Sequence, residues 1–149
     1  MAPHTSDITL KIDPESLHRT KMGTISGEIW LQGDEWAFPA ARWNDIVIPV
    51  LSAWLAAVNH LSRGMRKRDL VHFMDGPYFV ELTTSANQIE LLLTADRPNG
   101  EARCCQADAV ALRKNAVDAA DLLLAKCREL EWKNDDIDYL RRTRDGARA

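Results

Sequence analysis

Alternating apolar and polar positions mark the strand-like parts of the chain. The longest such stretch is 70–82, where alternation continues on both sides of Asp75-Gly76-Pro77. Aspartate and glycine accept the positive φ of a tight turn, and proline cannot donate to a strand ladder, so this stretch is predicted to be a β-hairpin. The same alternation, or a short run between turn residues, predicts further strands at 7–12, 22–31, 35–38, 88–94 and 101–106.

Apolar residues spaced three and four apart predict helices in two long segments. The first lies between Asn44, a suitable N-cap, and Gly64, a suitable C-terminal residue. Its core-facing positions are Val47, Leu51, Trp54, Val58 and Leu61. A second long helix is predicted at 107–132 with Asp108 as its cap, and a short third one at 135–144 with Asn134 as its cap.

Short turns between successive strands indicate antiparallel pairing, since parallel strands need long crossover connections. We therefore predict an α+β fold, in which an antiparallel meander of about 5–6 strands carries two long helices packed on one face. The 149 residues suit a single domain spanning 1–149, with disordered tails at 1–6 and 145–149. The second face of the sheet is left open, and the pattern does not decide which face that is.

Composition narrows the class of protein. A net charge of −3 argues against nucleic-acid binding, and the place of the basic cluster at 63–68 after a helix C-terminus explains part of that cluster. The most apolar stretch, 46–61, is shorter than the roughly 20 residues that span a bilayer, so no membrane segment is predicted. Three cysteines make a poor disulfide framework, which favours reduced thiols and a cytoplasmic location. Cys104 and Cys105 should point to opposite faces of a strand.

No motif for nucleotide binding, serine hydrolysis or metalloprotease chemistry is present. The acidic group Asp135, Asp136 and Asp138 lacks the glycine and glutamate of a calcium loop and suits a helix N-terminus instead. We therefore predict no cofactor, no metal and no catalytic residue. An enzymatic alternative would use His72, Asp75 and Glu81 as acid–base groups on and around the hairpin.

The candidate residues for binding a partner are Trp36, Asp75, Tyr78 and Glu81. Tryptophan and tyrosine are over-represented among the anchors of protein interfaces. Trp36 lies near Trp30 and Trp43 in the sequence, around the first predicted hairpin. These tryptophans form either a recognition patch or a hydrophobic rim over the sheet.

Two passages together resemble a known group of proteins. They are F-P-x-x-x-W-N-D, from Phe38 to Asp45, and F-M-D-G-P-Y, from Phe73 to Tyr78. Within about 22–93 the chain is similar to small bacterial proteins that are encoded beside polymorphic toxins and act as immunity proteins. The resemblance implies a non-enzymatic protein that neutralises a cognate toxin by direct, stoichiometric binding, but it assigns no contact residue. The alternative is a small-ligand-binding or regulatory domain that uses the open sheet face.

Overall fold

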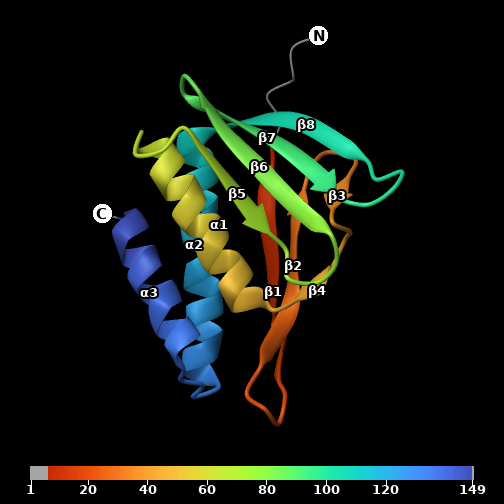
Figure 1. The fold of residues 1–149 in the computed structure, drawn as a ribbon. Helices are drawn as coiled ribbons and strands as arrows, with labels where there is room; N and C mark the ends of the chain where they lie inside the picture. Colours follow the sequence, from red (N-terminus) through yellow and green to blue (C-terminus); the bar gives the residue numbers. More distant parts are fainter. Residues whose placement is uncertain (1–6, 149) are drawn as a thin grey trace.

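The computed structural model describes residues 7–148, which fold into eight strands and three helices (Figure 1). The predicted tail at 1–6 lies outside the described residues. In chain order the elements are β1 (Thr9–Arg19), β2 (Ile25–Gln32), β3 (Ala37–Phe38), β4 (Asn44–Asp45), α1 (Val47–Ser62), β5 (Arg68–His72), β6 (Tyr78–Ser85), β7 (Gln88–Ala95), β8 (Ala102–Asp108), α2 (Ala109–Glu129) and α3 (Asp135–Arg148).

The strands form two antiparallel sheets, which confirms the predicted α+β class. Within the described residues each sheet has four strands: β1-β2-β3 with β4 also paired to β2, and the meander β5-β6-β7-β8. The strands are thus divided between two sheets, whereas one sheet of about 5–6 strands was predicted. The division falls at α1, which follows β4 and precedes β5, so the chain leaves the first sheet before it begins the second (Figure 1).

Helix α1 is the centre of the core. It contacts α2 and α3 as well as strands of both sheets, namely β2, β5 and β6. A helix surrounded in this way must be apolar on nearly all sides, and its five predicted core positions are all buried, together with Ile48, Val50, Leu55 and Ala57. The prediction of a core helix is confirmed, although the helix packs against more than the one sheet face expected.

The N-termini of the helices correct one predicted cap and confirm two. Asn44 is not the N-cap of α1: it pairs with Glu28 in β4, and Ile46 takes the cap position without a side-chain hydrogen bond. The predicted caps of the other helices are confirmed, because Asp108 accepts from the Ala111 N–H at 2.9 Å and Asn134 accepts from the Ile137 N–H at 2.8 Å.

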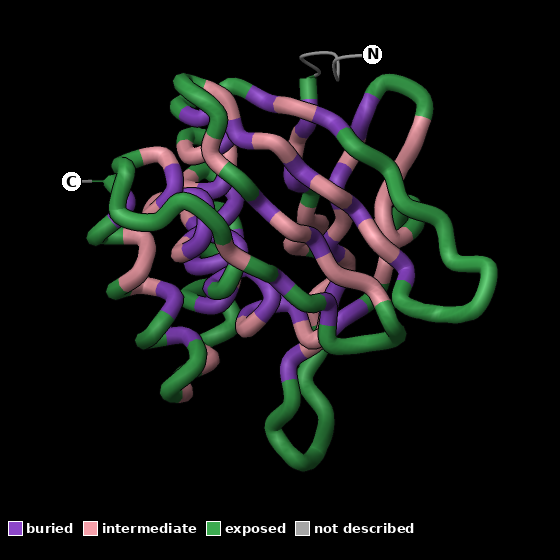
Figure 2. The backbone as a smooth tube through the Cα atoms, turned by 45° about the horizontal axis from the view of Figure 1, so that its top comes forward, coloured by how far each residue is buried: buried purple, intermediate pink, exposed green. Residues whose placement is uncertain are grey.

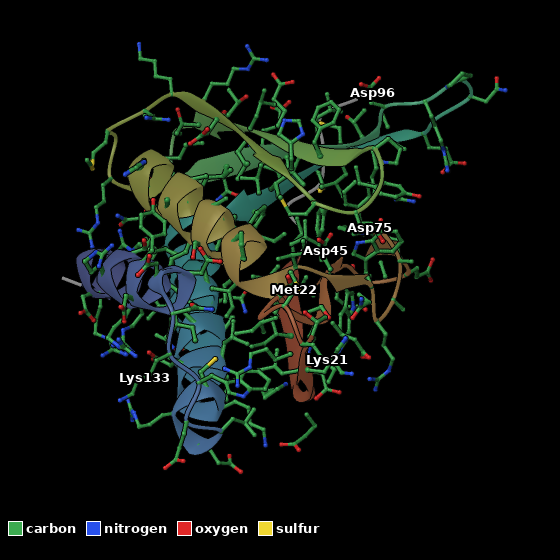
Figure 3. All side chains as sticks on the ribbon, turned by 60° about the horizontal axis from the view of Figure 1, so that its bottom comes forward. Lys21, Met22, Asp45, Asp75, Asp96 and Lys133 are labelled. Carbon is green, nitrogen blue, oxygen red and sulfur yellow. The ribbon has the colours of Figure 1, made fainter. Side chains whose placement is uncertain are left out.

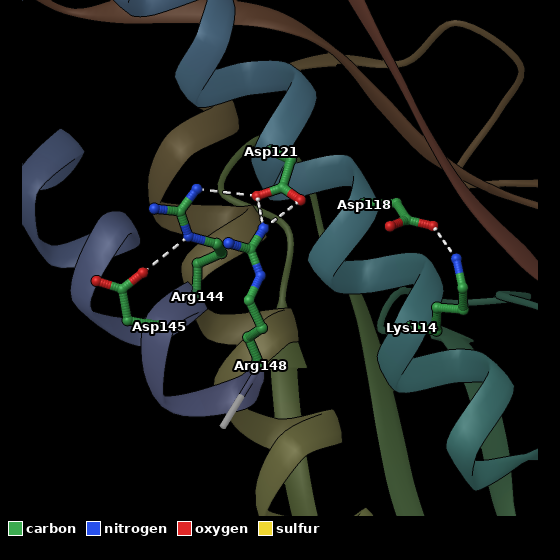
Figure 4. A network of polar contacts seen from close by, with 6 residues as sticks. All are labelled: Lys114, Asp118, Asp121, Arg144, Asp145 and Arg148. Atoms are coloured by element: carbon green, nitrogen blue, oxygen red, sulfur yellow. Dashed lines mark hydrogen bonds and ion pairs between the residues drawn. The ribbon is translucent and has the colours of Figure 1, made fainter.

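The predicted disordered tail at 145–149 is wrong for 145–148, because α3 continues through Arg148. Ala147 is buried in this last turn. Arg144 and Arg148 both reach Asp121 on α2, at 2.9 and 2.6 Å, and tie the end of α3 to its neighbour (Figure 4). The few apolar residues after 144 gave no pattern from which this docking could be predicted.

The two faces of the β5–β8 sheet differ sharply. One face is buried, with Val71, Val80, Leu82 and Leu91 pointing into the core. The opposite face holds the cross-strand row Leu70, Glu81, Leu92 and Cys104. Buried and more accessible positions therefore alternate along these strands (Figure 2). The open face is the one that bears Glu81, a point the sequence left undecided.

Within residues 7–148, no helix combines the length and the apolar composition that crossing a membrane requires.

Candidate functional site

A groove of about 500 Å³ lies where the β2–β3 hairpin meets the adjoining ends of β6, β7 and β8. We call it the Trp36–Tyr78 groove. Both residues line it, and the other side chains that matter for its chemistry are Phe38, Arg97, Glu101 and Arg103. It therefore combines aromatic walls with charged groups at a junction of the two sheets.

The β2–β3 hairpin holds Trp36 firmly in place. The Gly33 N–H and the Gln32 side-chain amide both donate to the Trp36 carbonyl, at 2.9 and 3.0 Å. The indole ring lies so close to Gly33 that no side chain would fit at that position. The Arg103 guanidinium lies over the ring, 5.3 Å from its centroid, within cation–π range.

Tyr78 belongs to an aromatic cluster at the start of β6. Its ring makes edge-to-face contacts with Phe38 and Trp43, at centroid distances of 5.7 and 5.1 Å. Phe38 also contacts Phe73 edge-on at 5.9 Å. Such edge-to-face pairs are a preferred aromatic geometry. The Arg97 guanidinium lies 5.7 Å from the Tyr78 centroid, so Tyr78, like Trp36, has an arginine beside it.

The two groove arginines keep their hydrogen-bond donors available. Within residues 7–148, neither the Arg97 side chain nor the Arg103 side chain makes a hydrogen bond or an ion pair, and both residues are exposed. Glu101 lines the same groove and is exposed, but no ion pair joins it to either arginine in this part of the chain. A guanidinium carries five N–H donors and no acceptor, so the groove presents free donors to a ligand.

Asp45 is the residue that fixes this junction, and it is only 2 % exposed. One oxygen accepts from the Ile46 and Met74 N–H groups, at 2.7 and 3.2 Å. The other accepts from Trp43 Nε1 and the Asp75 N–H, at 3.0 and 3.2 Å. A buried carboxylate is tolerated when its oxygens are hydrogen-bonded in this way. Figure 3 shows Asp45 beneath the turn that bears Asp75.

These contacts show what the two motifs do in the fold. Phe38, Trp43 and Asp45 come from the first motif, and they contact Phe73, Tyr78 and the 74–75 backbone of the second. The motifs thus build one joint between the sheets. Asp45 was not among the predicted site residues, so this clamp was missed.

The four predicted partner-binding residues do not form one site. Trp36 and Tyr78 line the groove together. Asp75 instead borders a separate hollow of about 240 Å³ beside Asp45. Glu81 lies on the open sheet face, where its carboxylate is paired with Arg68 at 2.7 Å.

The alternative acid–base set is also dispersed. His72 and Glu81 share the open sheet face, but His72 packs against Phe79 with ring centroids 5.4 Å apart. In the described part of the chain no hydrogen bond joins His72, Asp75 and Glu81. Residues 7–148 contain no group of three or more His, Cys, Asp or Glu placed to hold a metal ion.

Sequence reasoning also missed the groove arginines. Strand alternation places Arg103 on the same face as the buried Cys105, and a charged residue at such a position is a signal that could have been used. Arg97 lies in the β7–β8 connection, and no periodic pattern marks it.

Cys104 and Cys105 point to opposite faces of their strand, as predicted, because Cys104 is exposed and Cys105 is buried. All three thiols are free. Burial raises the pKa of Cys105 to about 11, and the neighbouring Cys104 adds to this. Partial burial, and then the Glu90 carboxylate that accepts from its thiol, raise the pKa of Cys104 as well. Raised pKa values lower the thiolate fraction, so none of these features activates a cysteine nucleophile.

Comparison of the chain with protein-family models, with curated proteins and with solved structures finds no match.

Proposed function

We propose that the protein is a non-catalytic binding domain that holds a partner protein in the Trp36–Tyr78 groove. The observation that carries this proposal is the make-up of the groove. Tryptophan, tyrosine and arginine are the residue types most enriched among interface hot spots, and the groove brings Trp36, Tyr78, Arg97 and Arg103 together. Among residues 7–148, its lining has no histidine, cysteine, serine, threonine or lysine, so it offers contacts rather than a nucleophile with a base.

We further propose that the partner is a toxin domain, and that binding neutralises it. The resemblance of the two motifs to immunity proteins supports this part of the proposal. Those motifs frame the groove, because Phe38 and Tyr78 line it while Trp43 packs against Tyr78. Three free thiols support a reducing compartment, the cytoplasm, as the place where binding occurs.

The test is co-expression with a toxin candidate taken from the genes that neighbour this one. The proposal predicts that cells survive induction of the toxin when this protein is present. It also predicts that the two proteins co-purify in a fixed ratio, as measured by light scattering on a sizing column. Failure to protect, with both proteins expressed at comparable levels, would contradict the toxin part. Absence of a complex would contradict the binding role with this partner.

One observation favours a second candidate, a domain that binds a small ligand. The groove volume of about 500 Å³ falls within the roughly 300–1,000 Å³ typical of small-molecule pockets. A metabolite that fills the groove should quench the fluorescence of Trp36. Trp36→Phe is the control, because it removes this signal while leaving the other four tryptophans in place. A flat response across a broad metabolite panel would argue against this candidate.

A further inference from the structure

We infer that the Trp36–Tyr78 groove selects an acidic segment of its partner, an extended stretch that inserts an Asp or Glu carboxylate between Arg97 and Arg103. A neighbouring apolar side chain of the same segment would lie against Trp36 and Tyr78. This inference rests on the proposed binding function and names the chemistry of the contact.

The first support is the state of the two guanidinium groups. Each lies over an aromatic ring, at 5.3 Å for Arg103 and 5.7 Å for Arg97. A ring face attracts the positive charge but does not accept the N–H donors as a carboxylate does. Since neither group is hydrogen-bonded elsewhere in residues 7–148, both can donate to an incoming carboxylate, a geometry for which the arginine fork is suited.

The second support is the local charge. Two arginines and one glutamate line the groove, which gives it a local charge of +1, whereas the whole chain carries −3. The groove therefore attracts an acidic segment, although the net negative charge of the whole chain would repel it. A basic segment would be repelled by the two groove arginines. Glu101 opposes an acidic ligand, so its neutralisation should strengthen binding.

Two other arginines that lie over aromatic rings provide the control for the experiment. Arg19 lies over Trp132 at 5.3 Å and Arg142 over Tyr139 at 6.0 Å, and both are exposed. Neither residue lines the groove. They are therefore the matched control for a general loss of positive charge or of a cation–π contact.

The experiment selects binders from a displayed library of random heptapeptides. It uses the wild-type chain, the double variant R97Q/R103Q and the control R19Q/R142Q. The inference predicts that the wild type and the control enrich peptides with at least one Asp or Glu beside an apolar residue, and that R97Q/R103Q does not. An enriched consensus without acidic residues, or one that R97Q/R103Q retains, would overturn the inference. Neither result decides the proposed function, which co-expression tests independently.

Affinities then give the size of the effect. The affinity of a fluorescein-labelled peptide of the selected consensus is measured by anisotropy titration. Removal of each arginine should lower this affinity by about ten- to a hundredfold. Glu101→Gln should strengthen it, and added salt should weaken it. Glu101→Gln is informative even if the double variant fails to fold, because unchanged or weaker binding would contradict the inference.

The remaining outcome is that a folded wild type enriches no peptide. That result would overturn the acidic-segment inference alone, since co-expression with the toxin tests the proposed function independently.

Discussion

Replacement of Asp45 by alanine tests the joint on which the groove is built. The variant removes both carboxylate oxygens and leaves four N–H donors without their acceptor. Two donors belong to the segment around Asp45 itself, Ile46 N and Trp43 Nε1. The other two, Met74 N and Asp75 N, belong to the β5–β6 turn. Asp45→Ala therefore cuts the polar link between the two sheets.

The magnitude follows from how well each donor can be rehydrated. A hydrogen bond to a charged group contributes about 1.5–3 kcal/mol. Met74 and Asp75 are exposed, so water can replace the lost acceptor there, whereas Ile46 and Trp43 are only partly accessible. Relief of the buried charge offsets part of the loss. We expect a net destabilisation on the order of 3 kcal/mol, against a total free energy of unfolding of about 5–15 kcal/mol.

Urea unfolding followed by circular dichroism measures this change. Asp45→Ala should lower the midpoint without changing the slope, because the surface exposed on unfolding is nearly the same. Asp75→Asn is the control: no hydrogen bond involves its side chain in the described residues, and it should change stability by less than about 0.5 kcal/mol. If Asp45→Ala were as stable as this control, the carboxylate would not hold the joint.

Three further predictions concern other parts of the structure. Iodoacetamide at pH 8 should label Cys104 before the two buried thiols. Glu90→Gln should speed the labelling of Cys104, because it removes an interaction that raises the Cys104 pKa. An unchanged labelling rate would contradict the role of Glu90. Gly33→Ala should destabilise the protein by about 1–3 kcal/mol and alter its near-UV circular dichroism, because the Trp36 ring occupies the space of the new methyl group; a spectrum and midpoint like those of the wild type would refute that packing. Asp121→Ala should speed hydrogen exchange in the last turn of α3. It should lower the free energy of unfolding of the whole domain by at most about 1 kcal/mol, since its two arginine contacts are partly exposed. Unchanged exchange would show that burial alone holds this turn.

Local patterns in the sequence were sufficient to predict much of the fold. Spacings of three and four located α1 and its core positions, and alternation with short turns located the β5–β8 meander. Asp108 and Asn134 act within three residues of their own positions, so their caps could be predicted as well. In each case the signal that locates the element lies within a few residues of it in the chain.

Long-range features could not be predicted in this way. Asn44 has the character of an N-cap, but its strand partner Glu28 lies 16 positions earlier, and no local signal marks that pairing. Asp45 accepts from backbone groups about 30 residues later. Trp36 and Tyr78 were predicted as binding residues separately, and only the packing of the two sheets places them in one groove, with Glu81 on another face.

The affinity of a groove-filling variant for the purified partner tests the central claim most directly. Ala102 is exposed and lines the groove, so Ala102→Trp should block it. Ala125→Trp makes the same change at an exposed position of α2, outside the groove lining. In titration calorimetry the proposal predicts at least a hundredfold loss of affinity for Ala102→Trp and wild-type affinity for Ala125→Trp. Equal affinity of the two folded variants would show that the partner binds elsewhere.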